Sequence, residues 1–361
     1  MKILYIAAEH VSGTLSLFQQ EHRRRGDECR YVTFWPSRWA FPEDICLHLS
    51  FMPNRSWVRN VREIFLRARG HGIHRPLTPE APYWNPRPLE SALFAFRDFI
   101  NWPDIAAAID RHGLDDFDII HLDGGLDFTR DGRFIDSVCK RGKHIACFYH
   151  GTDLRNRGIV RNVDRHVELR LTSEWDLLDY DPRLEYLYLP FDTAEYRDRI
   201  HRLHNPIRIC HASRNIFKGT GHIISAVDHL KQKHSVELIL LQDMPHDVAL
   251  RIKNECDIFV DQLTNAGGWG YGMSSIEALA MGLPVVTNIP PKMSDQLRDH
   301  PFVQADTETI AEVLERLVTN QYLCRACSQA GQKWVRARHD IRIVGDQLYA
   351  HYRRLGWTNA G

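Results

Sequence analysis

Strand-like and helix-like segments alternate along most of this chain, and this alternation limits its fold more than any other feature. In the first half, the buried strand patterns KILYIA (2–7), FDIIHLDGG (117–125) and HIACFYHG (144–151) are separated by helical segments. A second series begins with IRICHA (207–212) and continues through VELILLQD, CDIFVDQL and LPVVTN. Such alternation predicts parallel sheets covered by helices on both faces. We therefore expect an α/β protein with two doubly wound, Rossmann-like domains.

The length of 361 residues is sufficient for two domains with separate cores. We assign residues 1–195 to an N-terminal domain and 205–338 to a C-terminal domain, connected by a polar, charged stretch. Residues from about 40 to 110 do not alternate and are rich in Pro, Trp and Arg, so they are interpreted as an insertion in the first domain.

Within this insertion, the segment 55–70 is amphipathic at helical spacing. Its apolar side chains share one arc, and the opposite arc carries Arg55, Arg59, Arg62 and Arg69. Two interpretations are open. The helix docks on the core and shows its arginines to water, or it lies on an anionic membrane surface.

Charge and cysteine content weigh against several classes of function. Lys plus Arg and Asp plus Glu number 46 each, so no overall positive field argues for nucleic acid. The chain enters a strand pattern without a signal peptide and has no apolar run of membrane-spanning length, so we expect a cytoplasmic protein. Cys324 and Cys327 form a CxxC without the second pair of a zinc site. Asp116 and Asp118 spell DxD, but they open a strand, and no metal site is expected.

The stretch 267–286, GGWGYGMSSIEALAMGLPVV, combines a glycine loop, a helix start and a carboxylate. Its glycines let backbone N–H groups turn toward a ligand, and Ser274 or Ser275 can cap the helix that follows. A helix N-terminus behind such a loop is an anion site. Glu277 lies one turn into the helix, where its carboxylate can reach the vicinal hydroxyls of a ribose. Taken alone, the stretch fits any β-loop-α-loop-β unit equally well.

Ligands of open α/β sheets bind beyond the carboxyl ends of the strands, and three further loops follow strands here. In HVSGT, Gly13 and Thr14 start a helix and can offer backbone N–H groups. In HGTDLR (150–155), His150 ends a buried strand beside Gly151 and Asp153; Asp153 is its partner, a capping residue or an acceptor contact. In HASRNIFKGTG (211–221), two cations at the mouth of a helix suit a diphosphate.

The C-terminal half resembles the donor domain of retaining, GT-B-fold glycosyltransferases of family 4. Two motifs carry the resemblance, and they comprise Arg214, Lys218 and Gly219, then Gly270, Tyr271, Gly272, Glu277, Ala278, Leu279, Ala280, Gly282 and Pro284. A weaker resemblance covers most of the chain. It implies two Rossmann-like domains facing a cleft, with a C-terminal helix (339–361) returning to the first domain.

The resemblance also implies roles for individual residues. His150, Lys218 and Glu277 are the expected catalytic residues: Lys218 opposes the donor diphosphate together with Arg214, Glu277 binds the donor ribose, and His150 lies by the transferred sugar. The full expected donor set is Arg214, Lys218, Gly219, Asp261, Gln262, Trp269, Gly270, Tyr271, Gly272, Met273, Ser274 and Glu277. The acceptor or cleft is assigned to Gly13, Thr14, Gly151 and Asp153.

The chain departs from the family pattern at one important position. The first family glutamate, which contacts the donor sugar, falls on Trp269, and an indole cannot supply a carboxylate. Either Asp261 or Gln262 takes its place, or the sugar is gripped differently, or donor use has been lost. Arg214 also lies one residue nearer Lys218 than is usual in the family.

The expected function is transfer of a sugar from a nucleotide-diphosphate sugar to a hydroxyl of a glycan or lipid-linked acceptor, in polysaccharide or glycolipid assembly. Retention at the anomeric carbon, independence of metal and the lack of a separate cofactor are implied by the resemblance. Two alternatives are a GT-B sugar-nucleotide epimerase and a non-catalytic homologue that binds nucleotide sugars.

Overall fold

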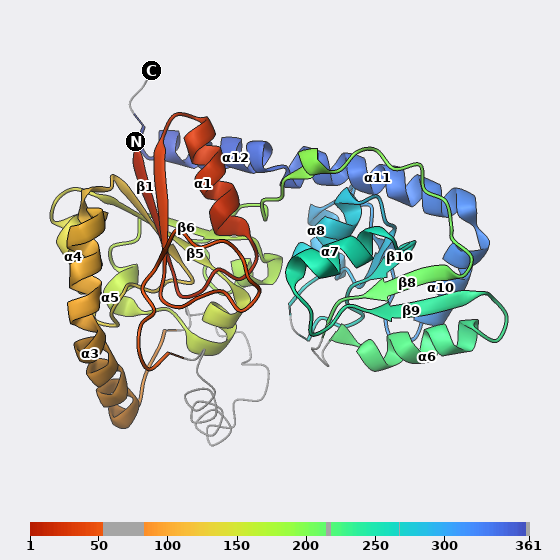
Figure 1. Ribbon diagram of the computed structural model, residues 1–361, viewed down its shortest axis with the longest axis horizontal. Helices are drawn as coiled ribbons and strands as arrows, with labels where there is room; N and C mark the ends of the chain where they lie inside the picture. The colour runs from red at the N-terminus through yellow and green to blue at the C-terminus, as the bar shows by residue number, and fades with distance from the viewer. Residues whose placement is uncertain (53–82, 214–217, 267, 359–361) are drawn as a thin grey trace. The chain divides into compact units, whose positions relative to one another are not determined.

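The computed structural model describes residues 1–52, 83–213, 218–266 and 268–358, and the chain divides into two compact units. Unit 1 comprises Met1–Tyr188 with Val344–Gly361, and unit 2 comprises Leu189–Ile343. Each unit contains one parallel sheet with helices packed on it (Figure 1). The prediction of an α/β chain with two doubly wound sheets is confirmed.

The sheet of unit 1 has the strand order β3-β2-β1-β4-β5-β6-β7, and all of its neighbouring strands are parallel. Its strands are β1 (Lys2–Ala7), β2 (Glu28–Thr33), β3 (Ile45–Cys46), β4 (Ile119–Asp123), β5 (His144–Tyr149), β6 (Leu169–Thr172) and β7 (Glu185–Tyr186). The central strands are almost fully buried because a parallel sheet is covered on both faces. This double covering explains their continuous apolar sequence.

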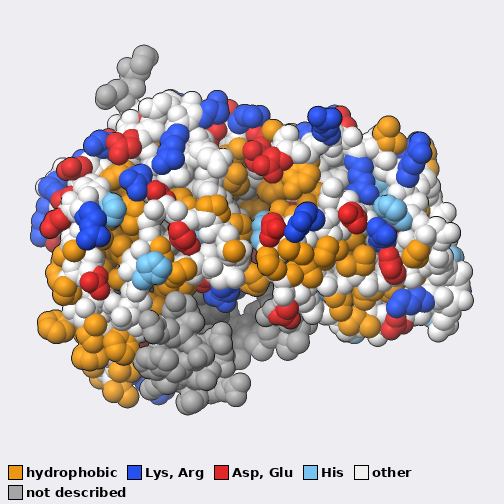
Figure 2. All heavy atoms as spheres, viewed as in Figure 1, with side chains coloured by type: hydrophobic (Ala, Val, Ile, Leu, Met, Phe, Trp, Pro, Cys, Tyr) orange, Lys and Arg blue, Asp and Glu red, His pale blue; other side chains and the backbone are white. Residues whose placement is uncertain are grey.

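The α-helices of unit 1 are α1 (Thr14–Arg24), α3 (Pro88–His112), α4 (Arg133–Cys139) and α5 (Arg161–Asp164), with a π-helical turn η2 (Thr152–Arg157) and 3-10 turns η1 (Leu114–Asp116) and η3 (Trp175–Asp179). Most of helix α3 lies within the region from 40 to 110 that the sequence assigns to an insertion. Pro88 is compatible with the first turn, and Pro103 lies inside the helix. The expected helix at 55–70 lies outside the described residues. Figure 2 shows that hydrophobic side chains gather over α3.

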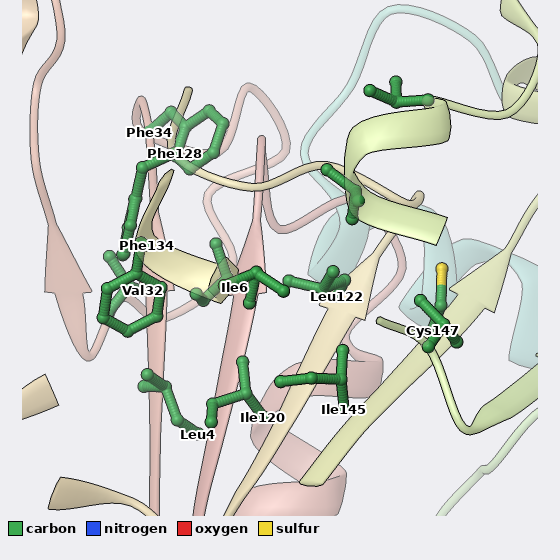
Figure 3. Packing of buried hydrophobic residues seen from close by; sticks show 14 of the residues in the cluster. Leu4, Ile6, Val32, Phe34, Ile120, Leu122, Phe128, Phe134, Ile145 and Cys147 are labelled. Carbon is green, nitrogen blue, oxygen red and sulfur yellow. The ribbon is translucent and has the colours of Figure 1, made fainter. Parts of the chain in front are cut away.

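The core of unit 1 lies between this sheet and its helices. Leu4, Ile6, Ile120, Leu122 and Ile145 project from three adjacent strands into one apolar cluster (Figure 3). Residues from Val344 onward in α12 (Ile341–Arg354) belong to the same unit.

Two buried tyrosines of α12 fix it against unit 1. The hydroxyl of Tyr349 lies 2.8 Å from Nδ1 of His22, and that of Tyr352 lies 2.5 Å from Nε2 of His121. Burial lowers the pKa of both histidines to about 3, so both rings are neutral at physiological pH.

The sheet of unit 2 has the order β12-β11-β10-β8-β9, with β8 at the switch between the two winding directions. Its strands are β8 (Ile207–His211), β9 (Val236–Leu240), β10 (Ile258–Val260), β11 (Val285–Thr287) and β12 (Val303–Gln304). The α-helices are α6 (Thr220–Leu230), α7 (His246–Asn254), α8 (Met273–Ala280), α9 (Pro291–Gln296), α10 (Ile310–Thr319) and α11 (Gln321–His339). The 3-10 turn η4 (Thr193–Glu195) lies before β8 in the chain.

Candidate functional site

The glycine loop of unit 2 connects β10 to α8 at the carboxyl end of the sheet. Gly270 has φ 75°, and a β-carbon there would collide with the sulfur of Met293, so the position requires glycine. The N-cap of α8 is Gly272, and no side chain caps this helix. The expected capping by Ser274 or Ser275 is therefore wrong. Both serines lie inside the first helical turn, and Ser275 donates its hydroxyl elsewhere.

Lys218 and Asp261 form an ion pair beside this loop. Lys218 precedes α6, and its neighbour Gly219 is the N-cap of that helix at φ 80°. The Nζ atom of Lys218 lies 2.5 Å from Oδ1 of Asp261, and the hydroxyl of Ser275 donates to Oδ2 at 2.6 Å. Asp261 is completely buried, whereas Lys218 is 25% exposed. The ammonium therefore has one side toward a buried carboxylate and another toward solvent.

Burial alone would raise the pKa of the Asp261 carboxyl. The charge of Lys218 and the hydrogen bonds from Lys218 and Ser275 outweigh burial and hold this pKa below its usual value. Asp261 is thus an ionised partner of Lys218.

Glu277 is also buried, and both of its carboxylate oxygens have partners. Oε2 lies 2.5 Å from Nζ of Lys253, and Oε1 lies 2.7 Å from Nε2 of His246. Burial would raise the pKa of Glu277, but the charge of Lys253, with the contact to His246, lowers it. Lys253 is fully buried, and His246 is about one third exposed. One oxygen of Glu277 thus has a buried partner and the other a partner that reaches solvent.

The remaining expected donor residues shape the loop. Gln262 donates from Nε2 to the carbonyl of Gly268 at 2.8 Å, so its amide holds the loop backbone. Tyr271 stacks on Phe302 and its hydroxyl lies 3.1 Å from Nε2 of His339. The ammonium of Lys292 lies 5.9 Å from the centre of the Trp269 ring. Met273 is the first residue of α8, and Arg214 lies outside the described residues.

In unit 1, His150 follows β5 and pairs with Asp123, the last residue of β4. Its Nε2 lies 2.5 Å from Oδ1 of Asp123. Burial would lower the pKa of His150, but the charge and the hydrogen bond of Asp123 raise it to about 9. His150 is therefore an imidazolium at neutral pH. It remains 34% exposed, so the cation is accessible to a ligand.

Of the three alternatives for Asp153, a hydrogen bond to the His150 ring is not what the structure shows. Asp153 instead accepts the backbone N–H of His150 at 3.2 Å and lies 3.4 Å from Arg157. Gly151 donates its N–H to Glu174 at 2.5 Å, and a β-carbon there would collide with Arg155.

Gly13 and Thr14 start α1 as expected. Gly13 is the N-cap at φ 75°, and Thr14 is the first helical residue. The hydroxyl of Thr14 lies 3.3 Å from that of Ser12.

Three partners in these sites, namely Asp123, His246 and Lys253, were missed by sequence reasoning. Asp123 had a usable signal, since it ends a buried strand that a parallel sheet sets beside the strand of His150. His246 and Lys253 had no comparable signal. Lys253 is a single lysine in a short polar helix, a position that is usually exposed.

Among the described residues, no cluster of three or more His, Cys, Asp or Glu side chains has the arrangement to hold a metal ion. The described helices include none that is both long enough and apolar enough to cross a membrane.

Comparison with known proteins places this geometry in context. Residues 218–334 match the profile of the family described as Glycosyl transferases group 1. Anabaena HepE, solved in complex with UDP-glucose, is similar in structure over 98% of this chain and 100% of its own, at 14% identity and TM-score 0.53. Trehalose-6-phosphate synthase OtsA is similar over 97% and 99%, at 11% identity and TM-score 0.61.

Sucrose-phosphate synthase from Thermosynechococcus elongatus is similar over 99% of both chains, at 13% identity and TM-score 0.54. The chain has the GT-B glycosyltransferase fold. No curated protein matches it in sequence.

The matched profile supports glycosyltransferase activity for this chain, and all of the matched residues lie in unit 2. The profile begins at Lys218 and includes Asp261, the glycine loop and Glu277. His150 and Asp123 lie in unit 1, outside the matched region. The described candidate residues of unit 2 thus lie within the family match, whereas those of unit 1 lie outside it.

Proposed function

We propose that this protein transfers a sugar from a nucleoside-diphosphate sugar to a hydroxyl acceptor. The observation that carries the proposal is the group at the carboxyl end of the sheet of unit 2. There a glycine loop, the uncapped start of α8, the ammonium of Lys218 and the ionised Glu277 all lie within the family match. HepE, with the same fold, was solved with UDP-glucose, and a related structure holds UDP-2-fluoro glucose.

In this proposal, Lys218 and the N-terminus of α8 stabilise the departing diphosphate. An ammonium and oriented backbone N–H groups act where negative charge develops, and such electrostatic stabilisation contributes more than any other effect to the rate of many transfer reactions. Asp261 holds the Lys218 ammonium from behind while its exposed side meets the phosphate. The transfer then needs no metal ion.

Glu277 is proposed to bind the donor ribose. Its Oε2 is held by the buried Lys253, so its orientation is fixed before the donor arrives. Its Oε1 contacts His246, which is partly exposed. The two ribose hydroxyls therefore approach from the His246 side, and they displace or share that contact.

His150 is proposed to donate hydrogen bonds to the transferred sugar or the leaving phosphate as an imidazolium. Asp123 keeps it protonated, and an imidazolium can stabilise negative charge on a bound ligand. Retention, membership of family 4 and a glycan or lipid-linked acceptor bound in unit 1 complete the proposal, and they follow from the resemblance.

Trp269 is proposed to form a wall of the sugar pocket in place of the family glutamate. An aromatic face packs on the C–H surface of a sugar. Asp261 and Gln262 are occupied by Lys218 and by the loop backbone, so the indole is the group that remains to contact the sugar. A donor-bound structure with the indole more than about 6 Å from the sugar, beyond contact range, would contradict this role.

A thermal-shift screen against UDP, GDP, ADP and their sugar conjugates tests the donor site. A nucleotide at a hundred times its dissociation constant stabilises the protein by about 2.7 kcal/mol. Lys218→Met and Glu277→Gln should each abolish the shift, and Lys231→Met at the far end of α6 should not. The absence of any nucleotide shift, or an equal shift in all variants, would contradict the proposal.

A non-catalytic nucleotide-sugar-binding protein is the second candidate, and two observations favour it. Trp269 replaces a family carboxylate, and Asp261 already neutralises the charge of Lys218. Release of free nucleotide from the donor that gives the largest thermal shift separates the two candidates. Binding without nucleotide release, in the presence of cell-derived glycan and lipid acceptors, would favour the second candidate.

A further inference from the structure

The most exposed side chains in the first three turns of α3 carry no charge. Leu89, Leu93, Phe96 and Phe99 are 62%, 50%, 57% and 76% exposed. The other exposed residues between Pro88 and Phe99 are Pro88, Ser91, Ala92 and Ala95. Figure 2 shows hydrophobic side chains gathered in the part of unit 1 where α3 lies in Figure 1.

The opposite face of α3 anchors the helix to unit 1. Asp98, Asn101, Ile105 and Ala108 are buried. Asn101 accepts the N–H of Ser50 and donates to its carbonyl, at 2.8 and 3.0 Å. The helix is therefore held in place without the exposed stripe, and the stripe contributes little to this anchoring.

The charged side chains in this part of α3 are at most partly exposed: Glu90 is half-buried and accepts the backbone N–H of Arg87 at 3.4 Å. Arg97 pairs with the buried Asp98 and lies 5.0 Å over the ring of Phe94. In the second half of the helix the exposed side chains include Asp104, Asp110 and Arg111. The apolar surface is thus confined to one end of the helix.

Isolated exposed hydrophobic residues are ordinary, but a continuous stripe of leucine and phenylalanine marks an interaction surface. Phe51 extends it, because its ring meets that of Phe96 at 6.3 Å in a T-shaped contact and is itself 40% exposed. We propose that this stripe inserts into the interfacial region of a lipid bilayer. The proposed lipid-linked acceptor would give such a contact its purpose, and to that extent the inference rests on the proposed function.

Two properties favour a bilayer over a second copy of the chain. The four large side chains expose on the order of 400–500 Å² between them, about half of the ~800 Å² per partner that a stable protein interface buries. A single helix face bearing Phe and Leu is also the usual form of an interfacial anchor. The exposed Arg87 at the start of α3 can meet lipid phosphates.

Flotation with phosphatidylcholine vesicles, with and without an equal part of phosphatidylglycerol, tests the proposal. The parent protein should float with both kinds of vesicle. It should continue to do so at about 1 M salt, where the Debye length is about 3 Å and surface charge is screened. Loss of flotation at high salt would assign binding to charged residues such as those of 55–70 and would overturn the proposal.

The variant Leu93→Asp/Phe96→Asp/Phe99→Asp should bind vesicles at least about a hundredfold more weakly. Its melting temperature should match that of the parent, since the changed side chains are exposed. The control Ile200→Asp/Tyr322→Asp removes exposed hydrophobic side chains from unit 2, at 73% and 82% exposure, and should float like the parent. Equal flotation of the triple variant would refute the role of α3.

Sedimentation equilibrium tests the competing occupant. We expect both the parent and the triple variant to be monomers. A dimer of the parent that the triple variant abolishes would show that a second copy covers this face, and it would overturn the proposal. A thermal shift with UDP keeps the two proposals separate. A shift retained without flotation refutes only the bilayer contact, and flotation retained without a shift refutes only the donor site.

Discussion

Replacing Lys218 by Met is expected to destabilise the fold in a manner that depends on pH. The change removes the ammonium 2.5 Å from Oδ1 of Asp261 and retains most of the hydrocarbon stem. Asp261 is completely buried, so its carboxylate is left in a dry site where the Ser275 hydroxyl still donates to it. Breaking a buried ion pair from one side typically costs about 3–5 kcal/mol.

Protonation of Asp261 sets an upper limit to this cost. Neutralising a carboxyl of pKa about 3.9 at pH 7 costs about 4 kcal/mol, because each pKa unit corresponds to about 1.36 kcal/mol. We therefore expect Lys218→Met to lower the free energy of unfolding by about 3–4 kcal/mol at neutral pH.

The sign of the pH dependence follows from the two pKa shifts. In the parent, the pKa of Asp261 is lowered, so the pair stabilises the fold above the unfolded pKa and this contribution is lost as pH falls through the folded pKa. In Lys218→Met, burial without the cation raises that pKa, so the variant loses stability as pH rises above about 4. The difference between the proteins should be small near pH 4 and grow toward neutrality.

Urea unfolding followed by circular dichroism at both pH values measures this difference. Lys218→Met/Asp261→Asn should recover most of the lost stability, because the uncharged amide needs no cation beside it. It should not recover nucleotide binding, because the Lys218 ammonium is still absent. Lys231→Met, which removes an exposed pair with Asp228, should change stability by no more than about 0.5 kcal/mol. A loss independent of pH, or a double variant as unstable as Lys218→Met, would refute the reasoning.

Asp123→Asn should lower the pKa of His150 from about 9 toward its usual value of about 6.5 in an NMR titration. The parent pair stabilises below pH 6.5 and loses this contribution as pH rises through 9; an unchanged pKa would disprove the assignment. Lys253→Met should cost about 3–5 kcal/mol in urea unfolding by leaving Glu277 without its buried cation, and a cost below about 1 kcal/mol would argue against a buried pair. Gly270→Ala should cost at least about 1–2 kcal/mol, seen as a lower melting temperature, because φ there is 75°; an unchanged melting temperature would show that the loop adapts.

Local patterns in the sequence predict many of the strands and helices. The strand expected at 2–7 is β1 (Lys2–Ala7), and the strand expected at 207–212 is β8 (Ile207–His211). Glu277 lies in the first turns of a short buried helix, as the glycine loop before it predicted. These features follow from local hydrophobic periodicity and from the backbone freedom of glycine. Both act over a few residues, so both can be recognised in the sequence.

The electrostatic partners of these residues, in contrast, depend on the tertiary structure. Asp261 meets Lys218 because β10 lies beside β8 in the sheet, and Asp123 meets His150 because β4 lies beside β5. Lys253 reaches Glu277 across 24 positions of sequence. A pairing of this kind depends on strand order and helix packing, which no local pattern encodes.

The same division applies to α3. Its apolar spacing can be read from the sequence, yet apolar residues at helical spacing ordinarily face a core. The structure buries Asp98 and Asn101 and leaves Phe96 and Phe99 in solvent. Hydrophobic periodicity shows which residues share a face of a helix. Whether another part of the protein covers that face depends on tertiary packing.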